Sequence, residues 1–276
     1  MRLLALDVDG TILDPYGRLP ANVREAVQRA RRRGLEVVLC TGRRYRTALP
    51  AARELALTGA MVVHNGVLVK DIESGRTDAN RYLPADLYAD LLGLLRENGP
   101  PLVYVDSYHE GTDIHTERPE RAHPFQSEYL DDNPEFTRVV TDLADSARDD
   151  VIMMSTMANL EALETLRRRV LERLGDRVLT HMLINKNYRG HILEFLAPGS
   201  GKWSALQDLA ASMEIGPEDI AAVGDDTNDV EMIREAGLGI AMGNAVPEAR
   251  AAADAVVRSN AEGGAVEAIE RVLLRL

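Results

Sequence analysis

The sequence has only one cysteine, Cys40, and no long apolar run, and each of these shortages excludes a class of protein. A single cysteine cannot form an intrachain disulfide, which favours a reducing compartment, so we expect a cytoplasmic protein. No apolar stretch approaches the roughly 20 residues that a membrane-spanning helix needs. The first apolar run is interrupted at Asp7, which is too early for a signal peptide.

Positive charge is also in short supply, with 32 lysine and arginine residues against 44 aspartate and glutamate residues and a formal net charge of -12. Such a surface repels nucleic acid phosphates and anionic lipids, so we expect neither nucleic acid nor membrane as a partner. It also repels small anionic substrates, and any phosphate site must therefore supply its own local positive charge. A length of 276 residues predicts one large domain or two modest ones.

Apolar runs alternate with helical periodicity at both ends of the chain. Nearly continuous apolar runs at 3–6, 35–40 and 220–224 are typical of strands that are covered on both faces. Alternation of this kind predicts a parallel sheet flanked by helices, which is an α/β, Rossmann-like core. The expected helices lie near residues 23–30, 44–56 with a kink or restart at Pro50, 202–213, 247–254 and from 264 onward.

The middle of the chain has a different character. Between residues 84 and 196, helices and strands are mixed and the segment has its own apolar positions, which predicts an inserted α+β domain. We therefore assign residues 1–83 and 197–276 to the catalytic core and residues 84–196 to the insertion. Just before it, Asn65-Gly66 between two apolar runs predicts a hairpin.

Polar residues follow three of the expected core strands, where ligands bind in an open parallel sheet. They are Asp7-Val8-Asp9-Gly10-Thr11, Thr41-Gly42-Arg43 and the acidic run from Asp225 to Asp229. Bringing Asp7, Asp225 and Asp229 together costs several kcal/mol unless a cation lies between them. Oxygen ligands and a substrate phosphate suit Mg²⁺.

The same residues suggest a reaction. Strand geometry lets Asp7 and Asp9 point toward one ligand, because residues two apart lie on the same side. One carboxylate could attack phosphorus to form an aspartyl-phosphate, while the second moves the protons. The metal and a lysine would neutralise the phosphoryl oxygens. Gly10 and Gly42 would let backbone amides approach the phosphate.

These motifs resemble those of the haloacid dehalogenase superfamily of phosphohydrolases. The matching stretches are DVDGT at 7–11, TGR at 41–43 and GDDTNDVEMI at 224–233, and Lys202 stands in place of the third-motif lysine. HNG at 64–66, GNA at 243–245 and Asn260-Ala-Glu-Gly also match. The resemblance is to the Cof-type group (subfamily IIB), whose C2-type cap is an α+β lid like the insertion here. Trp203 departs from the pattern, because many relatives have glycine after this lysine.

The resemblance implies a role for each matching position. Asp7 would be the nucleophile, and Asp9 the general acid/base whose backbone carbonyl also binds Mg²⁺. The Thr41 hydroxyl would hold the phosphoryl group, and Lys202 would pair with Asp7 and the phosphate. The implied metal site consists of Asp7, Asp9 and Asp225, with Asn228 and Asp229 completing it, partly through water.

Several neighbouring residues have simpler interpretations. Cys40 ends an apolar strand and is interpreted as an inert buried side chain. Asn65 is either a hairpin residue or a ligand, and Asp226 is interpreted as solvated or capping. Two segments of the insertion, 185–189 and 115–121, are either exposed loops or substrate contacts, and we assign neither as a site.

We therefore expect a Mg²⁺-dependent phosphatase that hydrolyses small phosphomonoesters, such as sugar phosphates, through an aspartyl-phosphate. The partner would be a small phosphorylated metabolite, selected by the cap. Two alternatives stay open: a phosphomutase of the same superfamily, and a non-catalytic ligand-binding or regulatory protein with this fold. The sequence leaves the particular substrate and the oligomeric state open.

Overall fold

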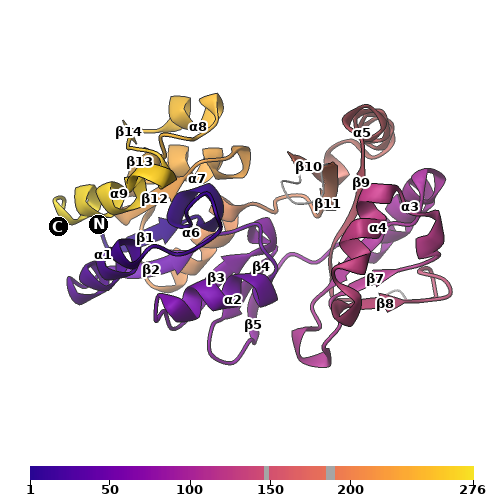
Figure 1. The fold of residues 1–276 in the computed structure, drawn as a ribbon, viewed down its shortest axis with the longest axis horizontal. Helices are drawn as coiled ribbons and strands as arrows, with labels where there is room; N and C mark the ends of the chain where they lie inside the picture. The colour runs from indigo at the N-terminus through magenta and orange to yellow at the C-terminus, as the bar shows by residue number, and fades with distance from the viewer. Residues whose placement is uncertain (146–148, 185–189) are drawn as a thin grey trace. The chain divides into compact units, whose positions relative to one another are not determined.

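The computed structural model describes residues 1–145, 149–184 and 190–276, which form two compact units. Unit 1 consists of Met1–Asn80 and Gly201–Leu276, and unit 2 of Arg81–Ser200 (Figure 1). The boundaries drawn from the sequence, after residues 83 and 196, lie a few residues from these. Within the described ranges, no helix combines the length and the apolar character needed to cross a membrane.

Unit 1 is built on a five-stranded parallel sheet in the order β14–β13–β12–β1–β2, as the alternation of apolar and helical segments predicted. Strand β1 lies between β2 and β12. The order in which the strands are added to the sheet therefore reverses direction at β1. The crevice at such a reversal is where open α/β sheets bind ligands. The strands are β1 Leu3–Leu6, β2 Glu36–Leu39, β12 Ile220–Gly224, β13 Leu238–Ala241 and β14 Ala255–Val256.

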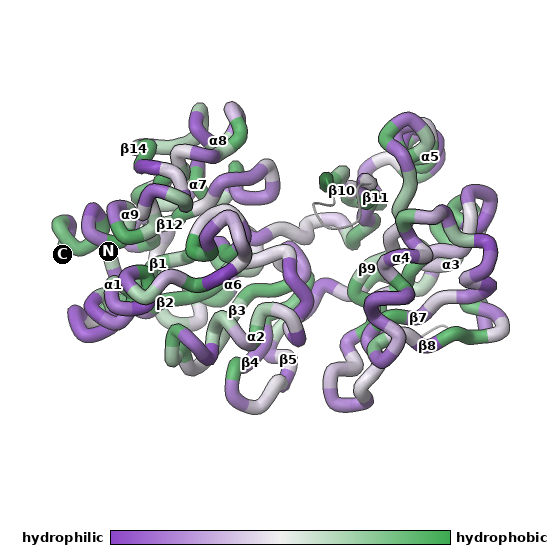
Figure 2. The backbone as a smooth tube through the Cα atoms, viewed as in Figure 1, coloured by the Kyte–Doolittle hydropathy of each residue, from purple (hydrophilic) through white to green (hydrophobic). Residues whose placement is uncertain are grey.

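Both faces of this sheet are covered. Leu3 and Ala5 pack in one cluster with Trp203 of helix α6, while Leu4 and Leu6 point to the other face and are equally buried. Burial on both sides explains why β1 is apolar at every position, as Figure 2 shows by its green colour. The helices of unit 1 are α1 Ala21–Arg32, α2 Tyr45–Glu54, α6 Lys202–Ser212, α7 Val230–Glu235, α8 Pro247–Ala252 and α9 Gly264–Leu273.

Helix α2 runs through Pro50 as one element, so the restart considered for this position does not occur. Pro50 lies on the exposed side of the helix, where the carbonyl group that loses its donor can face water.

The predicted hairpin is present and continues into a third strand. Strands β3 (Ala60–Val63), β4 (Leu68–Asp71) and β5 (Thr77–Asn80) form an antiparallel sheet, and a single parallel bridge joins Cys40 to Val62 of β3. The sequence did not reveal β5, because its residues are polar and mostly exposed.

Unit 2 contains a six-stranded sheet in the order β10–β11–β9–β6–β7–β8, antiparallel except for the β7–β8 pair. Leucines of α3 and α5 pack in one cluster with residues of β9 and β11, including Met154 and Phe195, and form a separate core. The elements are α3 Ala85–Leu95, β6 Leu102–Val105, β7 Ile114–Thr116, α4 Pro124–Asp131, β8 Thr137–Val139, β9 Val151–Ala158, α5 Leu160–Leu174, β10 Leu179–Ile184 and β11 His191–Leu196.

Candidate active site

The parallel pairing of β1 and β12 brings two acidic strand ends together. These strands pair in register from Leu3–Ile220 to Leu6–Val223, and the Asp7 amide donates to the Val223 carbonyl at 3.0 Å. Asp7, Asp225 and Asp229 are buried, and each offers a carboxylate oxygen within 4.8 Å of the others. Residues separated by more than 200 positions therefore form one acidic cluster.

Lys202 is the cation of this cluster. As the first residue of α6, it donates from Nζ to Asp7 Oδ1 and to Asp229 Oδ1, both at 2.7 Å, and it is only 2% exposed. The β3–β4 turn packs directly against the start of α6, since a Cβ atom on Gly66 would lie 1.9 Å from the Gly201 carbonyl oxygen. The turn and the lysine thus hold fixed positions relative to each other.

The charges in the cluster do not balance, because three carboxylates face one ammonium group. Burial raises the pKa of Asp7 well above its usual value, against the lowering effect of Lys202, and Asp229 and Asp225 raise it further. Burial acts to lower the pKa of Lys202, but Asp229 and Asp7 outweigh it and the pKa lies above its ordinary value. A divalent cation would supply the missing positive charge and favour ionised Asp7.

Polar neighbours orient the acidic side chains. Asp229 Oδ2 accepts the Asp225 amide at 3.0 Å, and Asp225 Oδ1 accepts the Thr11 hydroxyl at 3.1 Å. Asn244 Nδ2 donates to Asp225 Oδ2 at 3.1 Å. Thr11 and Asn244 lie within the DVDGT and GNA stretches, but no role was predicted for either side chain from the sequence. A Cβ atom on Gly10 would overlap Asp225, which explains the glycine there.

The end of β2 contributes a second group of predicted residues. Thr41 is buried, and its Oγ1 accepts the Arg43 amide at 3.1 Å. Gly42 packs closely against Asn65, since a Cβ atom at Gly42 would lie 2.8 Å from Asn65 Oδ1. The same oxygen accepts a hydrogen bond from Asn228 Nδ2 at 2.9 Å. Asn65 is therefore both the hairpin residue, with φ 54°, and a link between the TGR and GDDTND segments.

Asp9 is placed differently from the strand-based expectation. Strand β1 ends at Leu6, so the alternation that would point Asp9 the same way as Asp7 does not apply. Arg43 instead clamps the Asp9 carboxylate, with Nε on Oδ2 at 2.7 Å and Nη2 on Oδ1 at 2.6 Å. The Asp9 side chain is 55% exposed and lies outside the buried cluster. The sequence did not predict this pairing.

The remaining interpretations have plain outcomes. Cys40 is buried, and burial raises the pKa of its thiol, as expected for an inert side chain. Trp203 packs into the unit 1 core. The Asp226 side chain accepts the Thr227 amide at 2.7 Å, so it is the predicted capping residue. Of the two insertion segments, 115–121 belongs to unit 2 and 185–189 lies outside the described residues.

Comparison with known proteins identifies the family. The sequence profile of the haloacid dehalogenase-like hydrolases matches residues 4–269. The chain is 28% identical over 268 residues to the 5-amino-6-(5-phospho-D-ribitylamino)uracil phosphatase YitU of Bacillus subtilis, covering 95% of this chain and 94% of that protein. It is 27% identical over 263 residues to the pyridoxal phosphate phosphatase YbhA of Escherichia coli, covering 94% of each.

A solved structure agrees with this assignment over nearly the whole chain. A haloacid dehalogenase-like hydrolase from Bacteroides thetaiotaomicron superposes with a TM-score of 0.82 at 27% identity, covering 98% of this chain and 99% of that one. The predicted family and enzyme class are thereby confirmed: the chain belongs to the haloacid dehalogenase-like hydrolases and is a Cof-type phosphatase.

Proposed function

We propose that this protein is a Mg²⁺-dependent phosphatase that hydrolyses small phosphomonoesters through an aspartyl-phosphate on Asp7. The observation that carries the proposal is the buried cluster in which Lys202 contacts Asp7 and Asp229 beside Asp225. It combines a nucleophile, a fixed positive charge and oxygen donors for a cation in one place.

The donor set fits a hard divalent cation. Metal–oxygen distances of about 2.1 Å put opposite ligands of Mg²⁺ roughly 4.2 Å apart. Asp7, Asp225 and Asp229 offer oxygens within 4.8 Å, so small movements or a bridging water would complete the shell. Asp229 already accepts from Lys202 and from the Asp225 amide, which favours a water-mediated role for it, with Asn228 beside it. When bound, the cation would neutralise charge on the phosphoryl oxygens.

The chain's own residues would carry out two chemical steps. Asp7 attacks phosphorus while Asp9 protonates the departing alcohol, and Asp9 then removes a proton from the water that cleaves the aspartyl-phosphate. Lys202 Nζ would hold the transferred group in line with Asp7, and the Thr41 hydroxyl and the Gly42 amide would bind its oxygens. The backbone carbonyl of Asp9 would be a further ligand of the cation, as the family resemblance implies.

Asp9 must leave Arg43 or share it with substrate to act in this way. The Asp9 side chain is 55% exposed, so water or a substrate can replace the guanidinium group and offset much of the cost of the exchange. The clamp is therefore compatible with a mobile acid/base group.

The substrate class is inferred from the family and the electrostatics. The two relatives described above are named for small phosphorylated metabolites, which supports a substrate of similar size for this chain. Unit 2 would select the alcohol portion, as the cap assignment from the sequence proposes. A net charge of -12 fits poorly with nucleic acid as substrate.

Replacing the nucleophile tests the proposal directly. Asp7→Asn should lower turnover of p-nitrophenyl phosphate by a factor on the order of 10³ or more. It should leave the melting temperature in EDTA unchanged or higher, because one carboxylate of the crowded cluster becomes neutral. Asp131→Asn, at an exposed position of α4, is the control and should retain wild-type activity.

The wild-type protein should need Mg²⁺ and lose activity in EDTA. With a sugar phosphate as substrate, it should release orthophosphate without isomerising the sugar. Turnover by Asp7→Asn at the wild-type rate would exclude Asp7 as the nucleophile. An isomerised, still phosphorylated sugar as the main product would instead identify a phosphomutase.

A further inference from the structure

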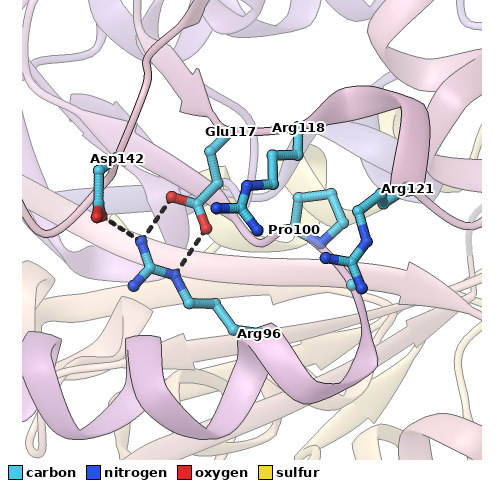
Figure 3. Close-up of a pocket in the computed structure, with 7 residues that line it drawn as sticks. Arg96, Pro100, Glu117, Arg118, Arg121 and Asp142 are labelled. Carbon is cyan, nitrogen blue, oxygen red and sulfur yellow. Dashed lines mark hydrogen bonds and ion pairs between the residues drawn. The ribbon is translucent and has the colours of Figure 1, made fainter.

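Unit 2 contains a polar cavity of about 200 Å³ that the catalytic proposal does not use. It forms where the chain beyond α3, the approach to β6, the turn after β7 and the segment after β8 meet (Figure 3). Its lining residues are Arg96, Gly99, Pro100, Glu117, Arg118, Arg121 and Asp142.

One wall of the cavity is fixed by internally satisfied charges. Arg96 donates to both Glu117 oxygens at 2.6 Å and also pairs with Asp142. Glu117 is 5% exposed and additionally accepts the Leu143 amide at 2.9 Å. The two parallel hydrogen bonds fix the orientation of both side chains. The Arg96 guanidinium group is therefore occupied by carboxylates of the chain itself.

The opposite wall carries two arginines, Arg118 and Arg121, whose guanidinium groups are not paired in this way. Arg118 and Arg121 make no side-chain hydrogen bond or ion pair with any residue in the described part of the chain. In Figure 3 their side chains reach to either side of Pro100, and the Arg118 guanidinium turns toward the Arg96–Glu117 pair. Three arginines and two carboxylates give the lining an excess of one positive charge, in a chain whose net charge is -12.

Backbone strain marks the same place. Arg118 has φ 43° and ψ 53°, the left-handed region that a residue with a Cβ atom occupies at a cost of roughly 1–2 kcal/mol. Strain of this kind persists where the surrounding structure holds it and is concentrated at ligand-binding positions. Here it directs a guanidinium group over the cavity.

We propose that this cavity binds the oxyanion group, phosphate or carboxylate, of a small metabolite. Guanidinium groups match both oxyanions by paired N–H donors, and Arg118 and Arg121 have those donors available. A water molecule occupies about 30 Å³ and drug-sized ligands fill about 300–1,000 Å³, so this cavity suits an anion with few additional atoms. The site lies wholly in unit 2 and does not depend on the proposed catalytic roles.

Calorimetric titration of the full-length protein in EDTA and low salt tests the site, with inorganic phosphate and succinate as separate probes. We expect at least one probe to bind at millimolar concentration. Arg118→Gly and Arg121→Ala should each weaken that binding about tenfold or more, because each removes one guanidinium group with its paired N–H donors. Arg173→Ala, an exposed arginine of α5, is the charge-matched control and should bind like the wild type. The probe that binds distinguishes phosphate from carboxylate.

Arg118→Gly also separates a binding role from a structural one. Glycine relieves the left-handed backbone, so the melting temperature should stay the same or rise while binding is lost. The proposal is overturned if neither probe binds the wild type, or if Arg118→Gly and Arg121→Ala both bind as tightly as Arg173→Ala. Because p-nitrophenyl phosphate turnover is read independently, failure here leaves the catalytic proposal standing.

Discussion

At the scale of single residues, Asp9 shows how a side chain can be recognised in sequence and still be misplaced. Its spacing from Asp7 suggested a common direction, but the turn after Leu6 sends it to Arg43. Sequence spacing predicts directions only within a regular strand, and it carries no information about which arginine a carboxylate will meet. The contribution of Asp9 to the reaction therefore has to be tested kinetically.

Asp9→Asn should separate the two chemical steps. The first step releases p-nitrophenolate, which is a good leaving group that needs little protonation, whereas the second needs a base to activate water. We expect a rapid release close to one equivalent of p-nitrophenolate, followed by turnover slowed by about 10²–10⁴-fold. Stopped-flow absorbance measures both phases. Linear product release at the wild-type rate would remove Asp9 from the mechanism.

The lowered pKa of Glu117 leads to a prediction about folding stability at acid pH. Burial acts to raise its pKa, but the Arg96 hydrogen bonds and the Leu143 amide outweigh this and the pKa is lower than in an unfolded chain. The unfolded chain therefore binds more protons below about pH 4.5, so stability should fall as the pH drops through that region.

Urea unfolding between pH 3 and 6 measures this dependence. Glu117→Gln keeps the shape of the side chain without its charge, so its stability should vary less across the acid range than that of the wild type. Glu97→Gln is the control, because Glu97 also pairs with an arginine but is 58% exposed at the side chain. Equal pH dependence in Glu117→Gln and wild type would contradict the prediction.

At the scale of elements, the core of unit 1 could be predicted because its strands and helices have strong periodicity. The elements that could not be predicted lack it. Strands β5 and β8 are largely polar and exposed, and α4 is held by long-range bonds from Gln126. Gln126 Nε2 donates to the Pro100 carbonyl at 2.6 Å, and its Oε1 accepts the Met157 amide at 3.1 Å. Contacts between residues so far apart in the chain leave no local pattern.

The contact between the β3–β4 turn and α6 gives an element-level prediction. Gly66→Ala would add strain at φ 88° and press a methyl group against the Gly201 carbonyl, displacing the start of the helix that carries Lys202. We expect a loss of about 2 kcal/mol or more in stability and at least tenfold in kcat/KM.

Gly17→Ala is the matched control for this substitution. Gly17 also has positive φ, at 73°, but an added Cβ atom would meet no atom within 4 Å. It should lose only about 1 kcal/mol and keep its activity. Urea unfolding and steady-state kinetics on both variants decide the matter, and similar losses in the two would show that backbone strain alone is responsible.

At the scale of the whole molecule, the insertion was visible in sequence because the segment between the TGR motif and Lys202 is far too long for a loop. Unit 2 is continuous in the chain and has its own apolar core, with buried leucines of α3 and α5 against Phe195. We therefore expect a polypeptide of residues 81–200 to fold alone.

Circular dichroism of that polypeptide should show a cooperative thermal transition, which Mg²⁺ does not shift, because the acidic cluster lies in unit 1. A polypeptide of residues 1–80 is the comparison and should remain unfolded, since its sheet lacks β12. A gradual, non-cooperative melt of residues 81–200 would contradict the independence of unit 2.

The division of unit 1 into two stretches also has a consequence during synthesis. Asp7 emerges from the ribosome before the second unit, while Lys202, Asp225 and Asp229 follow only after that unit has been translated. A chain that is terminated before residue 202 therefore carries Asp7, the proposed nucleophile, without the ammonium group of Lys202 that pairs with it. We expect phosphatase activity to arise only after residue 229 has been added, so shorter products would be inert toward phosphate esters.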